Sequence, residues 1–186
     1  VLIEIDYILH IWLGDNIPQY TSIFVVIIVL NSFINNLNAA ISGIVHATGK
    51  MKVYQLSGGS ISFLSVIFVY VAMLIWNIPS IALIVVLGLD IIRQIVALIV
   101  LKSLVKKFSM SLYFREVILP VISVALLSLI FPLQAHNLID EGFLRLSVVL
   151  IVSTISILLS IYTVGLNNNE KNIIAQMTNS IIKRKK

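Results

Sequence analysis

Long apolar stretches with few charges run through this chain, and they restrict its fold more than any other feature. Apolar residues make up 59% of the 186 residues and charged residues 11%, against about 25% charged in a soluble domain. A helix needs about 20 mostly apolar residues to cross a bilayer. The sequence therefore predicts an all-α, polytopic transmembrane helix bundle. Five spans are expected: about Tyr20–Val45, Tyr54–Trp76, Ile78–Leu101, Val117–Leu133 and Leu146–Val164. The fourth is short, and Pro120 should kink its first turns.

The two ends of the chain depart from these spans. Val1–Leu13 has the pattern of the outer end of a sixth helix, without the flanks of a signal peptide, so we expect the C-terminal part of a longer protein. We divide the chain into a transmembrane bundle, residues 1–165, and a cytoplasmic basic amphipathic tail, residues 166–186. A frayed basic tail is the alternative. The apolar residues of the tail recur at helical spacing: Ile173, Ile174, Met177, Ile181 and Ile182.

Basic residues occur in every second loop, and this sets the expected orientation. The loops after the first and third spans and the tail are basic, whereas the segment before the first span and the loops after the second and fourth carry few or no basic residues. Cytoplasmic loops are rich in Lys and Arg. The pattern therefore places the C-terminus in the cytoplasm, together with a basic rim formed by Lys50 and Lys52.

Amide side chains form a stripe along the first span. Asn31, Asn35, Asn38 and Ser42 follow one helix face. Polar groups inside spans usually face protein or water, because lipid penalises them. Two interpretations stay open. The stripe can hydrogen-bond neighbouring helices, or it can line a hydrated cavity that binds sugar hydroxyls.

The second and third spans carry further polar residues. Small residues at Gly58, Ser62 and Ser65 share one face of the second span and favour close helix packing. In the third span, Asp90 and Arg93 stand three residues apart, a spacing at which they can pair. They are either a local ion pair or part of a transport path.

Other function classes lack their residues. The stretch Gly43–Gln55 contains Gly-Lys, but a phosphate-binding loop needs four residues between its first Gly and the Gly-Lys pair, then a Ser or Thr. Here five residues separate Gly43 from Gly49, and Met51 follows the pair. The three His residues fall in separate edges or loops, and Cys is absent. We therefore expect no catalytic residues, cofactor or metal, and we attribute the net charge of +5 to membrane orientation rather than to nucleic acid.

Two motifs carry a resemblance to a known family. The stretch "HIWLGDNIPQY" has a Trp-Leu-Gly near a helix end, then Pro and Tyr opening the next helix, and the loop "ATGKMKVYQ" follows one span later. "FSMSLYFREVILP" and "LNNNEK" add similar features further on. Together they resemble the C-terminal half of bacterial polysaccharide flippases, in the superfamily that also holds the multidrug and toxin extrusion transporters.

The resemblance implies one lobe of a two-lobed transporter around a central cavity. Such a protein moves undecaprenyl-pyrophosphate-linked oligosaccharide across the bacterial inner membrane for cell-surface polysaccharide biosynthesis. Membrane lipids and polysaccharide polymerase machinery are the other expected partners. A cation-coupled drug exporter using Asp90, or a membrane scaffold of envelope assembly, is the alternative.

Overall fold

The computed structural model describes residues 2–174 and 176, and it is 86% helical with no strand among the described residues. Within these residues, five helices are long and apolar enough to cross a membrane. The all-α fold expected for the chain is therefore confirmed, as is a helix in its first residues, where η1 (Leu2–Glu4) leads into α1 (Ile5–Leu13). The candidate spans are Thr21–Ala47 (α2), Lys52–Trp76 (α3), Pro79–Leu104 (α4), Met110–Leu138 and Phe143–Gly165.

The chain divides into two compact units. One comprises Leu9–Met110 and the other comprises Val1–Ile8 with Ser111–Lys186. We call them the α2–α4 unit and the α6–α7 unit. The division of residues 1–165 from residues 166–186 remains a prediction.

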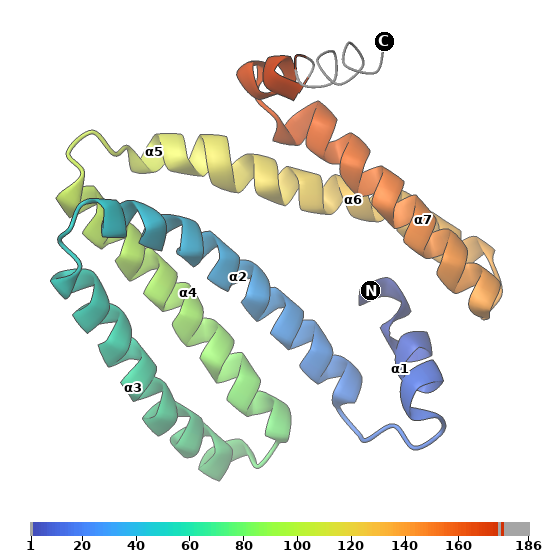
Figure 1. Ribbon diagram of the computed structural model, residues 1–186. Helices are drawn as coiled ribbons and strands as arrows, with labels where there is room; N and C mark the ends of the chain where they lie inside the picture. Colours follow the sequence, from blue (N-terminus) through green and yellow to red (C-terminus); the bar gives the residue numbers. More distant parts are fainter. Residues whose placement is uncertain (1, 175, 177–186) are drawn as a thin grey trace. The chain divides into compact units, whose positions relative to one another are not determined.

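In the α2–α4 unit, α4 lies between α2 and α3 and packs against both (Figure 1). Only a small number of side chains in these helices are buried. They include Ile41, Val45, Ala97 and Leu101. Most large apolar side chains face outward; Phe63, for example, is 72% exposed. Such outward apolar faces are expected for helices that lipid surrounds.

The Gly-Lys pair follows directly after the end of α2. The amide of Gly49 donates to the carbonyl of His46 at 3.1 Å, and the Thr48 hydroxyl donates to the carbonyl of Val45 at 2.7 Å. Gly49 has φ 69°, the left-handed conformation that closes many helices and that glycine adopts most easily. The glycine before Lys50 therefore serves to end a helix.

In the α6–α7 unit, α6 (Leu119–Leu138) and α7 (Phe143–Ser160) pack side by side as a hairpin. The prediction of a short fourth span is wrong. The helix runs without a break from α5 (Met110–Tyr113) through η2 (Phe114–Ile118) into α6, 29 residues in all.

Pro120 does not end this helix, because a π-helical turn precedes it. In η2 the amide of Leu119 donates to the carbonyl of Phe114, five residues back. A proline inside a helix lacks the donor of the normal bond and crowds the carbonyl four residues before it. The wider π turn just before Pro120 is a way to accommodate both effects.

The tail can be followed only in part. A helix covers 168–174, in which Ile173 and Ile174 are exposed. The predicted apolar positions Met177, Ile181 and Ile182 lie outside the described residues.

Candidate functional site

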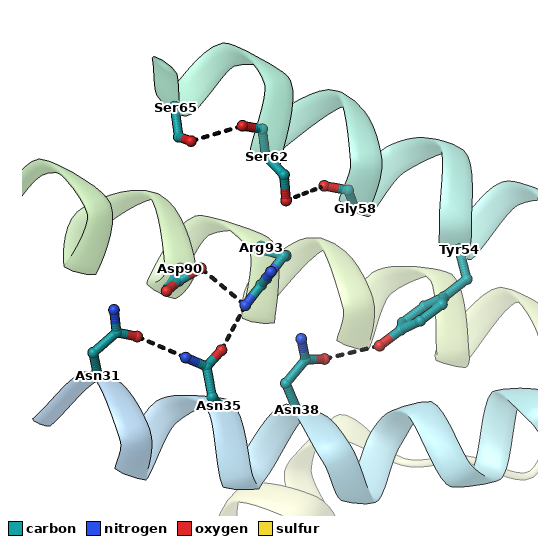
Figure 2. Close-up of polar contacts among 9 residues, drawn as sticks. All are labelled: Asn31, Asn35, Asn38, Tyr54, Gly58, Ser62, Ser65, Asp90 and Arg93. Atoms are coloured by element: carbon teal, nitrogen blue, oxygen red, sulfur yellow. Dashed lines mark hydrogen bonds and ion pairs between the residues drawn. The ribbon is translucent and has the colours of Figure 1, made fainter. Parts of the chain in front are cut away.

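A line of polar side chains connects α2 with α4 (Figure 2). The amide nitrogen of Asn35 donates to Asn31 Oδ1 at 2.8 Å, one helical turn away. Arg93 Nη2 donates to Asn35 Oδ1 at 2.5 Å and meets Asp90 Oδ1 at 2.9 Å. Two amides and an ion pair from two apolar helices thus form one continuous network.

A second contact joins α2 to the start of α3. The Tyr54 hydroxyl donates to Asn38 Oδ1 at 3.0 Å, one turn along α2 from Asn35 (Figure 2). Next to it lies a pocket of about 270 Å³ among α2, α3 and α4. Its lining includes Asn38, Tyr54, Gly58, Ser62, Arg93 and Ala97. Arg93 therefore belongs to the polar network and to the pocket at once.

The small residues of α3 open this pocket rather than bring helices together. A Cβ atom at Gly58 or Gly59 would meet no other heavy atom within 4 Å, so no neighbouring helix approaches there. The Ser62 hydroxyl bonds back to the carbonyl of Gly58 at 3.1 Å. At Gly58 the close packing predicted for this face is therefore not found within the described chain, and Gly58 and Ser62 border a polar space.

The network does not use all of its donors. Asp90 and Arg93 have side chains 14% and 27% exposed, and the buried Nε of Arg93 has no hydrogen-bond partner among the described residues. Both amide atoms of Gln94 are also buried and without a partner in this part of the chain. An unpaired buried polar group costs about 1–3 kcal/mol, so these groups favour an additional acceptor or water.

The structure brings together most of the residues that the sequence singles out. Asn31, Asn35, Asp90 and Arg93 form the network, and Asn38 reaches the pocket through Tyr54. Ser42 is half-buried and lies outside the pocket lining, while Lys50 and Lys52 are exposed near the start of α3. The sequence did not indicate Tyr54 as a partner of Asn38. The available signal was the position of Tyr54, an aromatic residue at the expected membrane interface, in the first turn of α3.

A separate charged cluster lies in the α6–α7 unit, and sequence reasoning missed it. Glu4 has a side chain only 1% exposed, and its Oε1 lies 2.7 Å from Nδ1 of His136 at the end of α6. Its Oε2 accepts from Nε and Nη2 of Arg145 at 3.2 and 3.1 Å, at the start of α7. The charge alternation predicts that the segment before the first span and the loop after the fourth lie on the same side of the membrane, which was the available hint.

The site and fold define the class of the chain but not its relatives. It is a multi-pass membrane protein by its five long apolar helices, with a polar network and pocket among three of them. Within residues 2–174 and 176, no group of three His, Cys, Asp or Glu side chains could hold a metal ion. Comparison with protein-family models, curated proteins and solved structures finds no match.

Proposed function

We propose that the protein is a flippase of the bacterial inner membrane, which translocates undecaprenyl-pyrophosphate-linked oligosaccharides for cell-surface polysaccharide biosynthesis. The proposal follows the resemblance of the loop and helix-end motifs. One structural observation supports it most: an Arg-containing polar network that borders a pocket within apolar spans. Polar groups at such positions usually face protein or water and mark substrate paths.

The chemistry of the network suits the two polar parts of such a substrate. Amide side chains such as Asn38 both donate and accept, so they match sugar hydroxyls. The guanidinium of Arg93 matches phosphate oxygens bidentately, and its Nε has no partner in the described chain. The polyprenyl tail would stay on the outward apolar faces of the helices, in lipid.

The proposed orientation brings substrate in from the cytoplasm. The alternation of basic loops along the sequence favours a cytoplasmic C-terminus and a cytoplasmic rim formed by Lys50 and Lys52. The pocket is lined by the first turns of α3, which starts at Lys52, so the rim and the pocket follow one another along the path of an entering pyrophosphate. A polysaccharide polymerase at the outer face would receive the product.

The pairing of Asp90 favours this function over a cation-coupled exporter. An exporter would use Asp90 as the carboxylate that binds a proton or sodium ion. Asp90 instead lies 2.9 Å from Arg93, whose positive charge competes with any such cation. A membrane scaffold would need neither the network nor the pocket.

Leucine substitutions along α2 test the proposal. Asn35→Leu removes an acceptor of Arg93, and Asn38→Leu removes the partner of Tyr54. Each should reduce surface polysaccharide and leave lipid-linked oligosaccharide on the cytoplasmic leaflet, with the protein still present in the membrane. Asn36→Leu is the matched control, because Asn36 is an exposed amide of the same helix outside the pocket lining. Normal export in both Asn35→Leu and Asn38→Leu would mean that the network serves only helix packing, and it would contradict the proposal.

A further inference from the structure

A second pocket lies in the α6–α7 unit, between two π-helical turns. It has a volume of about 410 Å³ and is lined by residues of η2 and by residues at and after η3 (Ile161–Gly165). Single-turn π segments are rare and are frequent at functional sites. Here two of them, far apart in sequence, border one space. We propose that this pocket binds the headgroup of an ethanolamine phospholipid.

The depth of the pocket in the membrane fits a headgroup. Gly165 ends the fifth candidate span, and Arg115 lies in the first turns of the fourth. The fourth span has 29 residues, or roughly 43 Å at 1.5 Å per residue, whereas the hydrocarbon core is about 30 Å thick. The charged side chains of Arg115 and Glu116 favour placing its first turns, rather than its last, in the polar interface. In the predicted orientation this is the cytoplasmic leaflet.

The backbone around the pocket offers free acceptors. Leu119, the usual helical donor to the carbonyl of Arg115, instead donates its amide to Phe114, and Pro120, which a continued π turn would use, has no amide hydrogen; the carbonyl of Arg115 is therefore left without either of these helical donors. Across the pocket, η3 ends at Gly165, and the last carbonyls of a helix lack intrahelical donors and carry partial negative charge. Lys171 Nζ satisfies one of them, the carbonyl of Thr163, at 3.3 Å.

The charged side chains of the lining add to this negative character. Glu116 and Glu170 are acidic, against one basic residue, Arg115. Glu170 is held in place, because its carboxylate accepts from the amide of Asn167 at 2.8 Å, as in a capping box at the start of the next helix. Arg115 and Glu116 have no ionic or hydrogen-bond partner among the described residues.

This arrangement matches one class of headgroup. A primary ammonium has three donors for the carboxylates and free carbonyls, while the adjacent phosphate can meet the guanidinium of Arg115. A choline headgroup has the same charges but no N–H donor. A purely anionic headgroup would face two carboxylates with one cation. The pocket should therefore distinguish ethanolamine from choline, as well as from glycerol.

Lipid titration of the purified protein, read by native mass spectrometry, tests this directly. Phosphatidylethanolamine, phosphatidylcholine and phosphatidylglycerol with identical acyl chains are compared. The first ethanolamine lipid should bind about tenfold more tightly than the choline lipid, since charged hydrogen bonds are lost in the latter. The N-monomethyl and N,N-dimethyl lipids should fall between them in order. Equal affinities for the ethanolamine and choline lipids, or tightest binding of the glycerol lipid, would overturn the proposal.

Substitutions then locate the preference. Glu116→Gln with Glu170→Gln should lower ethanolamine binding to the choline level, and glutamine at 170 can still cap the helix. Arg115→Gln should weaken both lipids alike, because both contain phosphate. Glu141→Gln is the matched control, an exposed glutamate of the same unit outside the pocket. An ethanolamine preference that survives the double substitution would place the binding elsewhere and refute the site. If the double variant does not fold, Arg115→Gln and the comparison of lipids on the unaltered protein still decide.

Discussion

Exchanging the two charges of α4 is the sharpest test of what Arg93 does. The double variant Asp90→Arg with Arg93→Asp keeps one anion and one cation at a spacing of three residues. It moves the cation by about 4.5 Å along the helix. The pocket lining includes Arg93 and not Asp90, so the exchange puts a carboxylate where the guanidinium was. The ion pair is conserved while the chemistry of the pocket is inverted.

The expected loss follows from the hydrogen bonds that a phosphate would make with Arg93. The guanidinium has five N–H donors, and among the described residues only Nη2 makes bonds, to Asp90 and Asn35. Two charge-assisted bonds to a phosphate are worth about 3 kcal/mol or more, which is a factor of roughly 100 in binding. The exchanged variant should therefore lose transport. Arg93→Lys keeps the charge but not the fork, so it should lose about tenfold.

The assay is made in cells that produce the protein, with each variant introduced at its gene. Surface polysaccharide and the lipid-linked oligosaccharide on the cytoplasmic leaflet are measured together with the amount of protein in the membrane. If the pair only neutralises itself, the exchanged variant should transport nearly normally. That result, or full transport by Arg93→Ala, would refute the binding role of Arg93.

Three further predictions concern orientation and stability. Because the chain has no native Cys, single Cys substitutions can test the orientation with an impermeant reagent added from the periplasm. A Cys at Asn77 or Asn137 should react, and a Cys at Thr48 or Asn168 should not. Labelling at Thr48 would refute the orientation. Glu4→Gln should lower the unfolding temperature of the purified protein by about 6 °C or more, because breaking a buried ion pair costs about 3 kcal/mol. The control Glu141→Gln should leave the unfolding temperature unchanged. An unchanged temperature in Glu4→Gln would contradict the structural role of Glu4. Gly49→Ala should destabilise by about 1–2 kcal/mol because of its positive φ, while Gly43→Ala in mid-helix, with open space at its Cβ, should be neutral or stabilising; equal effects in thermal unfolding would refute this reasoning.

The number and type of the helices could be predicted because lipid imposes a simple rule. A span must satisfy its backbone internally and must be about 20 apolar residues long, and both conditions are visible in sequence. The limits of the fourth span were not visible. Arg115 and Glu116 interrupt the apolar run, but a helix can continue past the hydrocarbon core into water, and the π turn lets it pass Pro120.

The candidate site was partly predictable for a similar reason. Helical periodicity placed Asn31, Asn35 and Asn38 on one face, and the spacing of Asp90 and Arg93 allowed their pair. Which helix faces meet depends on packing between spans, and the periodicity within one span carries no information about that packing. Hence the bond from Arg93 to Asn35, 58 residues away, was not foreseen, nor was the cluster around Glu4.

The two charged clusters differ in how completely they are satisfied, and this difference bears on their roles. Both oxygens of Glu4 have partners, from two helix ends, and its side chain is almost fully buried. Such saturation is what a structural cross-link needs, since a partly satisfied buried charge is costly. Around Arg93 the opposite holds. Its Nε and the amide of Gln94 have no partner in the described chain, and Arg93 also lines a pocket. A membrane protein that required these groups only for packing would gain stability from apolar replacements. The unsatisfied Nε of Arg93 beside a pocket therefore supports the proposed role of this side chain in binding a polar substrate.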